Sequence, residues 1–235
     1  KTASLDITDP MGIMCLIASI KQRGHQADLF LTNLEPNLFR AVAEYKPDVI
    51  GFSVTSGSEG YYLELIRRLR PHAKFISVMG GPHPTFFPEI LEKDEVDIIC
   101  RGEGDDAMPE LLDKLQAGAD YSAIPNLSVK KDGKIIRNPM RPLIQDLDRL
   151  PFPDRDSFLK YYAYAHSSVK HFLAGRGCPY DCTYCFNHKL KKMYREEAGV
   201  GQYCRLRSVE NVVAEVEQVH AKYPLKIVYF HDDLF

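Results

Sequence analysis

The run Asp48-Val-Ile-Gly-Phe-Ser53 decides the fold of the first half of the chain, because it is short, rich in β-branched residues and followed by small polar residues. An amphipathic stretch with helical spacing follows it, and the same order then repeats. Strands are predicted at 48–53, 75–79 and 96–100, and helices at about 60–70, near 88–93 and at 107–116. Short polar turns between such elements imply parallel strands and right-handed crossovers. The sequence therefore predicts a doubly wound, Rossmann-like parallel α/β sheet.

Small residues follow each of these three predicted strands. Ligands of such sheets bind beyond the carboxyl ends of the strands, where the strand order reverses, and small residues let a ligand approach the backbone closely. Taken singly, each of these residues also fits a plain turn of the chain. Together they predict a binding site formed by Ser53, Thr55, Ser56, Gly80, Gly81, Gly102 and Glu103.

Other segments frame this sheet. Residues 11–24 are predicted to form the helix that follows a first strand, although 1–7 is a meagre candidate for that strand. The stretches 126–129 and 134–137, joined by a Gly-containing turn, predict a small hairpin. Four prolines between 139 and 153 indicate an interdomain linker.

A second strand–helix–strand unit follows the linker. A short strand at 171–174 leads into a Gly-rich loop, and a helix at 209–222 opens at Ser208. The strand 226–230 comes next and ends in His231-Asp232-Asp233. Its open edge predicts that the domain is truncated in this chain.

Three of the six cysteines stand within eight residues, at Cys178, Cys182 and Cys185. Thiolates suit iron–sulfur clusters or zinc, and a closed site of either kind takes four protein ligands. Three ligands would leave one iron open, as a catalytic centre requires. Zinc is the alternative, with Cys204 or His188 as a fourth ligand, although zinc sites usually combine two short Cys pairs. We expect the remaining cysteines to be plain thiols.

Composition excludes several classes of protein. The 30 basic and 32 acidic residues nearly balance, so there is no sign of the basic face that a nucleic-acid binder needs. The apolar stretch 11–20 is too short to span a bilayer and lacks the flanks of a signal peptide. We therefore expect a cytoplasmic protein with no nucleic-acid or membrane partner.

The run Gly175-Arg-Gly-Cys178-Pro-Tyr-Asp-Cys182-Thr-Tyr-Cys185 closely resembles the Cys-x3-Cys-x-aromatic-Cys signature of the radical S-adenosylmethionine (SAM) superfamily. The resemblance implies a [4Fe-4S] cluster on the three cysteines. It also implies SAM chelated at the open iron, and reductive cleavage of SAM to a 5′-deoxyadenosyl radical. An electron donor such as flavodoxin or ferredoxin is implied as well.

The same resemblance assigns roles to residues near SAM. Tyr184 stands at the aromatic position of the signature, which implies a place near the adenine. The segment Phe230-His-Asp-Asp233 is similar to the one that meets the methionine amino group, which implies that role for Asp232 and Asp233. As an alternative, the two carboxylates would cap a following helix.

The first half resembles the cobalamin-binding domain found upstream of many radical SAM barrels, through residues 79–89, 101–104 and 147–154. This implies cobalamin, with Ser53, Thr55 and Ser56 lining the space for its nucleotide tail and Gly80 and Gly81 beside it. The Asp-x-His-x-x-Gly motif of other cobalamin proteins is absent, because residues 6–12 contain no histidine. We therefore predict that no histidine of that loop ligates cobalt, and we expect His83 to be a turn element.

The resemblance divides the chain into a cobalamin-binding-like α/β domain (1–138), a linker (139–168) and the start of a radical SAM (β/α) partial barrel (169–235). The leading hypothesis is a cobalamin-dependent radical SAM enzyme that performs methyl transfer or related radical chemistry such as ring formation. The alternatives are a radical SAM enzyme with a vestigial first domain, and a cobalamin-binding module without catalysis. We expect this piece alone to be inactive, and the sequence does not name the substrate.

Overall fold

The computed structural model describes residues 9–199 and 201–234, so the first strand expected at 1–7 lies outside the described residues. The chain forms two compact units. One unit is Phe30–Arg141, and the other joins Lys1–Leu29 to Pro142–Phe235. The expected domain ranges stay a prediction, and these units differ from them by grouping the helix after residue 10 with the C-terminal half.

The unit Phe30–Arg141 is built on a five-stranded sheet whose strands follow chain order. The strands are β1 (Val49–Ser53), β2 (Ile76–Gly80), β3 (Ile98–Cys100), β4 (Leu127–Lys131) and β5 (Lys134–Arg137). The pairs β1–β2 and β2–β3 are parallel, whereas β4 pairs antiparallel with β3 and forms the predicted hairpin with β5. The α/β class with parallel strands is confirmed.

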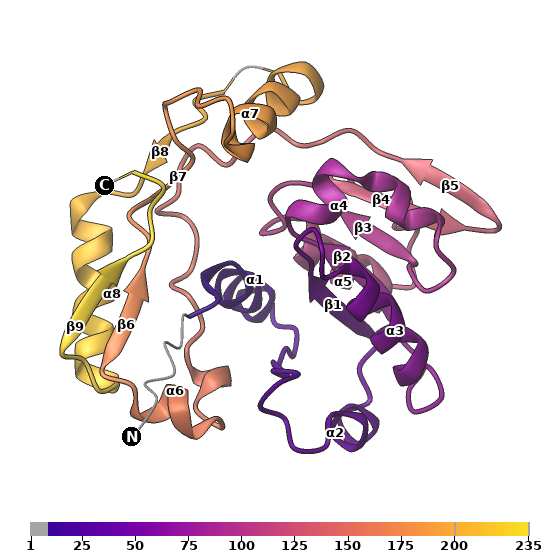
Figure 1. Ribbon diagram of the computed structural model, residues 1–235, viewed down its shortest axis with the longest axis horizontal. Helices are drawn as coiled ribbons and strands as arrows, with labels where there is room; N and C mark the ends of the chain where they lie inside the picture. Colours follow the sequence, from indigo (N-terminus) through magenta and orange to yellow (C-terminus); the bar gives the residue numbers. More distant parts are fainter. Residues whose placement is uncertain (1–8, 200, 235) are drawn as a thin grey trace. The chain divides into compact units, whose positions relative to one another are not determined.

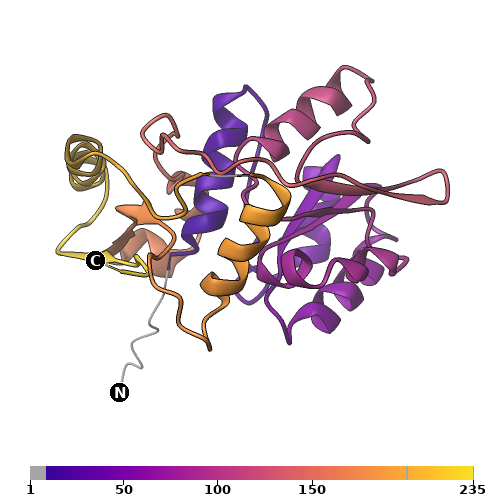
Figure 2. The same cartoon turned by 90° about the horizontal axis from the view of Figure 1, so that it is seen from above.

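Helices cover both faces of this sheet. They are α2 (Leu38–Tyr45), α3 (Glu59–Leu69), α4 (Pro82–Phe86), the 3₁₀ helix η1 (Pro88–Glu92) and α5 (Ala107–Gln116). Figure 2 shows α5 on one side of the sheet and α3 with α4 on the other. Ile66, Met79 and Leu91 are fully or almost fully buried in the core between α3, β2 and η1. The sequence interpretation missed α2 and α4, and the helix expected near 88–93 is a 3₁₀ helix.

The second unit contains the segments that surround the cysteines. Its elements are α1 (Met11–Gln22), η2 (Asp156–Phe158), α6 (Tyr162–His166), β6 (Val169–Phe172), β7 (Gly175–Arg176), α7 (Phe186–Glu197), β8 (Arg205–Leu206), α8 (Val209–Lys222) and β9 (Ile227–Phe230). Strands β6 and β9 pair in parallel, and β7 pairs antiparallel with β8. Figure 1 shows α8 alongside β6 and β9, which confirms the predicted strand–helix–strand unit.

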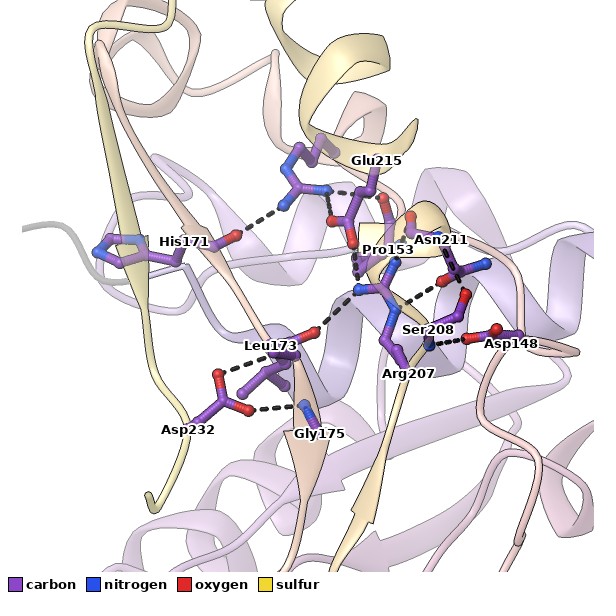
Figure 3. A network of polar contacts seen from close by, with 12 residues as sticks. Asp148, Pro153, His171, Leu173, Gly175, Arg207, Ser208, Asn211, Glu215 and Asp232 are labelled. Carbon is purple, nitrogen blue, oxygen red and sulfur yellow. Dashed lines mark hydrogen bonds and ion pairs between the residues drawn. The ribbon is translucent and has the colours of Figure 1, made fainter. Parts of the chain in front are cut away.

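A buried ionic network holds α8 to the segment that precedes β6 (Figure 3). Glu215 of α8 is fully buried and forms ion pairs with Arg155, at 2.8 Å, and with Arg207. The Arg155 guanidinium also donates to the carbonyl of His171 at 2.6 Å, and Arg207 donates to that of Leu173 at 2.9 Å. The network thus fixes the carboxyl end of β6, where the chain turns toward the cysteines.

Within the part of the chain that the structure describes, no helix is both long and apolar enough to cross a membrane.

Candidate functional site

The loop Cys178–Cys185 connects β7 to α7 and carries the three predicted thiolate ligands. Gly177, which precedes it, has φ +83°, and a Cβ there would lie 2.4 Å from the carbonyl oxygen of Tyr203. Only glycine fits such a close approach of two backbone segments. Cys182 is exposed, whereas Cys178 and Cys185 are half-buried. The loop therefore starts from a fixed backbone position and presents its middle cysteine to solvent.

All three thiols are free, and nothing in the loop pairs them as disulfides. Among residues 9–199 and 201–234, no three His, Cys, Asp or Glu side chains converge closely enough to hold a metal ion. The three thiols stand close together in the sequence, on one loop. In type and number they still fit a cluster with one open iron, because they are soft donors and there are three of them on one loop.

His188 and Cys204, the alternative fourth ligands of a zinc site, lie outside the cysteine loop. The imidazole of His188 lies 3.5 Å from the Asp181 carboxylate and is half exposed. Cys204 is a half-buried free thiol next to β8. Neither residue joins the three loop cysteines in a metal-binding group within the described residues.

The two carboxylates after β9 bind the segments that flank the cysteine loop. Asp232 accepts hydrogen bonds from the backbone N–H groups of Ala174, at 3.0 Å, and Gly175, at 2.6 Å (Figure 3). Asp233 accepts from the side-chain amide of Asn187 at 2.9 Å. The end of β9 is thereby tied to both sides of the loop. Tyr184, by contrast, is 92% exposed and directly precedes Cys185.

Buried polar residues of α7 anchor the loop from its other end. The Asn187 side chain accepts a hydrogen bond from the Tyr203 hydroxyl at 2.7 Å, while it donates to Asp233. Lys191, one turn further along, reaches the loop carbonyls and Asp181. Its ammonium holds the pKa of Asp181 below its usual range. Helix α7 was not predicted, because the buried residues Asn187 and Lys191 interrupt the apolar pattern of its buried face.

In the other unit, the structure brings together the loops that follow β1 and β2. Gly81 has φ +94°, and a Cβ there would lie 3.0 Å from both the backbone N and O of Val54. The Val54 N–H donates to Gly80 at 2.8 Å, and the His83 N–H donates to Val54 at 2.9 Å. The predicted glycines therefore serve the contact between the two strand ends.

The side chains of these loops also meet. The Ser56 hydroxyl lies 3.2 Å from Nδ1 of His83, and the Thr55 and Ser58 hydroxyls are 3.3 Å apart. His83 is buried in α4, so the expectation of a turn element is wrong. Proline at the start of α4 favours a helix there, because its fixed φ suits the first helical position.

The segment after β3 joins the same edge of the sheet. The Gly102 N–H donates to the Thr85 hydroxyl of α4 at 3.1 Å, and the Asn126 side-chain amide donates to the carbonyl of Glu103. Gly102 has φ +73°, a conformation that favours glycine. All three predicted strand-end segments therefore lie at one edge, held together through α4.

Known proteins resemble both the N-terminal and the C-terminal half of this chain. The family model of the B12 binding domain matches residues 2–112. An uncharacterized methyltransferase of Pyrococcus horikoshii is 31% identical over 236 residues, which cover 96% of this chain and 49% of that protein. The chain thus spans about half the length of this curated relative.

Two solved structures share the fold at 19% identity. The radical SAM methyltransferase TsrM of Kitasatospora setae, solved with cobalamin and a [4Fe-4S] cluster, has a TM-score of 0.72 over 97% of this chain and 46% of its own. The cobalamin-dependent SAM radical enzyme OxsB, solved with aqua-cobalamin and SAM, has a TM-score of 0.77 over 97% of this chain and 32% of its own. Both likenesses show the fold and nothing more specific.

Proposed function

We propose that this chain, a member of the radical SAM proteins that carry a cobalamin-binding domain, is part of a cobalamin-dependent radical SAM enzyme that transfers a methyl group. The B12 binding domain match and the methyltransferase relative support cobalamin and the reaction type. The electron donor is proposed to be of the flavodoxin or ferredoxin kind.

One observation carries the proposal: three free thiols stand within eight residues on a solvent-exposed loop, at the carboxyl end of a parallel strand pair. Ligands of α/β folds bind at such strand ends. Plain structural cysteines are usually buried, as Cys100 is, whereas Cys182 is exposed. Exposed, clustered thiols on an anchored loop are what a cofactor-binding segment needs.

We assign the following roles to residues of this chain. Cys178, Cys182 and Cys185 would hold the cluster, with the loop closing on it. Tyr184 would offer its exposed ring to the adenine, and Asp233, whose second oxygen is not engaged by Asn187, would face the methionine amino group. Asp232 is less suited to that contact, because two backbone N–H groups already occupy its carboxylate. When bound, the cluster supplies an electron for SAM cleavage, and cobalamin supplies methyl transfer.

In the unit Phe30–Arg141, cobalamin would bind along the edge formed by the strand ends. Ser53, Thr55 and Ser56, with Gly80 and Gly81, would line the nucleotide tail, and the Gly102–Glu103 turn would close the same edge. His83 contacts Ser56, so the proposal keeps it as part of this edge and not as a cobalt ligand. An electron paramagnetic resonance spectrum of the cobalt(II) form without imidazole coordination would agree with this assignment.

The test is metal analysis after anaerobic reconstitution with iron, sulfide and hydroxocobalamin. We expect about four irons per chain, as a cubane cluster requires, together with stoichiometric cobalt. Cys182→Ala should abolish iron binding and leave cobalt unchanged. Cys204→Ala is the matched control, because it removes a half-buried thiol outside the motif.

Each other outcome points to an alternative. Iron without cobalt would indicate a radical SAM enzyme with a vestigial first domain. Cobalt without iron would indicate a cobalamin-binding module, and Cys182→Ala would then change nothing. Zinc in place of iron, lost on replacing Cys204, would overturn the cluster assignment.

A further inference from the structure

Lys191 directs its whole hydrogen-bonding capacity at the cysteine loop. Its ammonium donates to the backbone carbonyls of Pro179, at 3.0 Å, and Tyr180, at 3.4 Å, and forms an ion pair of 2.6 Å with Asp181. An ammonium has three N–H donors and no acceptor. All three partners are consecutive residues between the first and the second cysteine of the motif.

This lysine is buried, which is unusual for its type. Its side chain is 7% exposed, whereas that of Lys192, the next residue on α7, is 64% exposed and pairs with Glu196. A buried ammonium is unfavourable unless it is fully hydrogen-bonded. The burial is therefore tolerated only as long as the loop stays in place over it.

The loop itself has little other support. Its residues from Pro179 to Tyr184 are exposed, and its one internal backbone hydrogen bond among the described contacts joins the N–H of Cys185 to the carbonyl of Cys182, at 3.0 Å. Exposed segments with few buried contacts open readily. The stretch between Cys178 and Cys182 thus depends on a side chain that lies below it.

We propose that Lys191 is a positioning residue that holds residues 179–181, so that Cys178 and Cys182 can ligate one cluster. The inference rests on the proposed function for its cluster, but the anchoring of the loop does not. Because Asp181 neutralises the ammonium, the role is to fix the backbone and not to place a net charge beside the thiolates. Nothing in the cysteine motif itself reveals this residue.

The experiment compares Lys191→Met with Lys192→Met in the protein before and after reconstitution. Hydrogen exchange of the Cys185 amide, which donates to the Cys182 carbonyl, is measured first, on the metal-free protein. Losing hydrogen bonds from a charged donor should speed this exchange by about tenfold or more. Lys192→Met should leave it unchanged, because its ammonium does not reach the loop.

Iron retention against a chelator is measured second, on the reconstituted protein. We expect Lys191→Met to lose iron much faster than wild type, whereas Lys192→Met matches wild type. Asp181→Asn keeps both carbonyl contacts of Lys191 and should lose iron more slowly than Lys191→Met. If Lys191→Met fails to fold, Lys191→Gln decides the matter, because its shorter, uncharged side chain does not reach all three partners. Iron loss faster than in wild type would support the anchoring, and wild-type retention would contradict it.

The two proposals fail in different ways. Wild-type loop exchange and iron retention in Lys191→Met would overturn the role of Lys191 and leave the cluster intact. No iron in wild type would overturn the proposed function, while faster loop exchange in Lys191→Met would still establish the anchor.

Discussion

Replacing Glu215 with Ala should destabilise the C-terminal unit strongly. The carboxylate is fully buried, and its removal leaves the guanidinium groups of Arg155 and Arg207 without their counter-charge. Breaking a buried ion pair by deleting one partner costs about 3–5 kcal/mol. We expect the lower end, about 3 kcal/mol, because each guanidinium keeps a carbonyl partner, those of His171 and Leu173.

For a chain of this size, that loss corresponds to a fall in Tm of about 6–12 °C. Urea denaturation followed by circular dichroism measures the free energy of unfolding directly. Glu217→Ala is the matched control, because Glu217 is exposed on the same helix, and it should change stability by less than about 0.5 kcal/mol. A loss below about 1 kcal/mol for Glu215→Ala would refute the view that the ionic network supports this unit.

Three further outcomes follow from local chemistry. Ser208→Ala removes the N-cap of α8, whose side chain accepts a backbone N–H at 3.1 Å, and should cost about 1 kcal/mol in urea denaturation. Burial raises the pKa of Cys100 to about 12, so alkylation at pH 8 should label Cys182 and spare Cys100 until the chain unfolds. Burial, and then repulsion from a neighbouring imidazole, lowers the pKa of His231. The unfolded chain then binds more protons just below the ordinary histidine pKa, so stability should fall as the pH drops through that value, and His231→Gln should reduce the effect.

The order of strands and helices was predictable because its signal is local. Strands β1 and β2, the helix α5 and the β4–β5 hairpin lie within one or two residues of the expected ranges, since burial imposes a periodic pattern on each of them. Helix α2 was missed, although Asn37 caps it by accepting the Arg40 N–H, because it is short and buries only Val42, which leaves little apolar periodicity. Helix α7 was missed because its buried face carries Asn187 and Lys191, which weaken the apolar periodicity.

In the candidate site, too, the residues with a local sequence signal were predictable and those that depend on distant contacts were not. Cysteine spacing and the comparisons identify the ligand segment and the kind of protein, because ligands of one cluster stand close together in the chain. The supports of that segment come from distant positions: Asp232 is 57 residues from Gly175, and Asp233 is 46 from Asn187. Such pairs follow from the parallel pairing of β6 with β9, which a single sequence does not specify at residue level.

In both candidate binding regions, a glycine stands where two backbone segments approach each other closely. Gly81 lets the loop after β2 pass against Val54, and Gly177 lets the chain before Cys178 pass against Tyr203. In each case a side chain would collide with another backbone segment, so the close approach depends on the absence of a Cβ. This close backbone contact at the end of a strand fixes the position of the first residues of the loop that follows. The loop's own polar and sulfur atoms then remain available for a ligand, and the supporting contacts come from other segments.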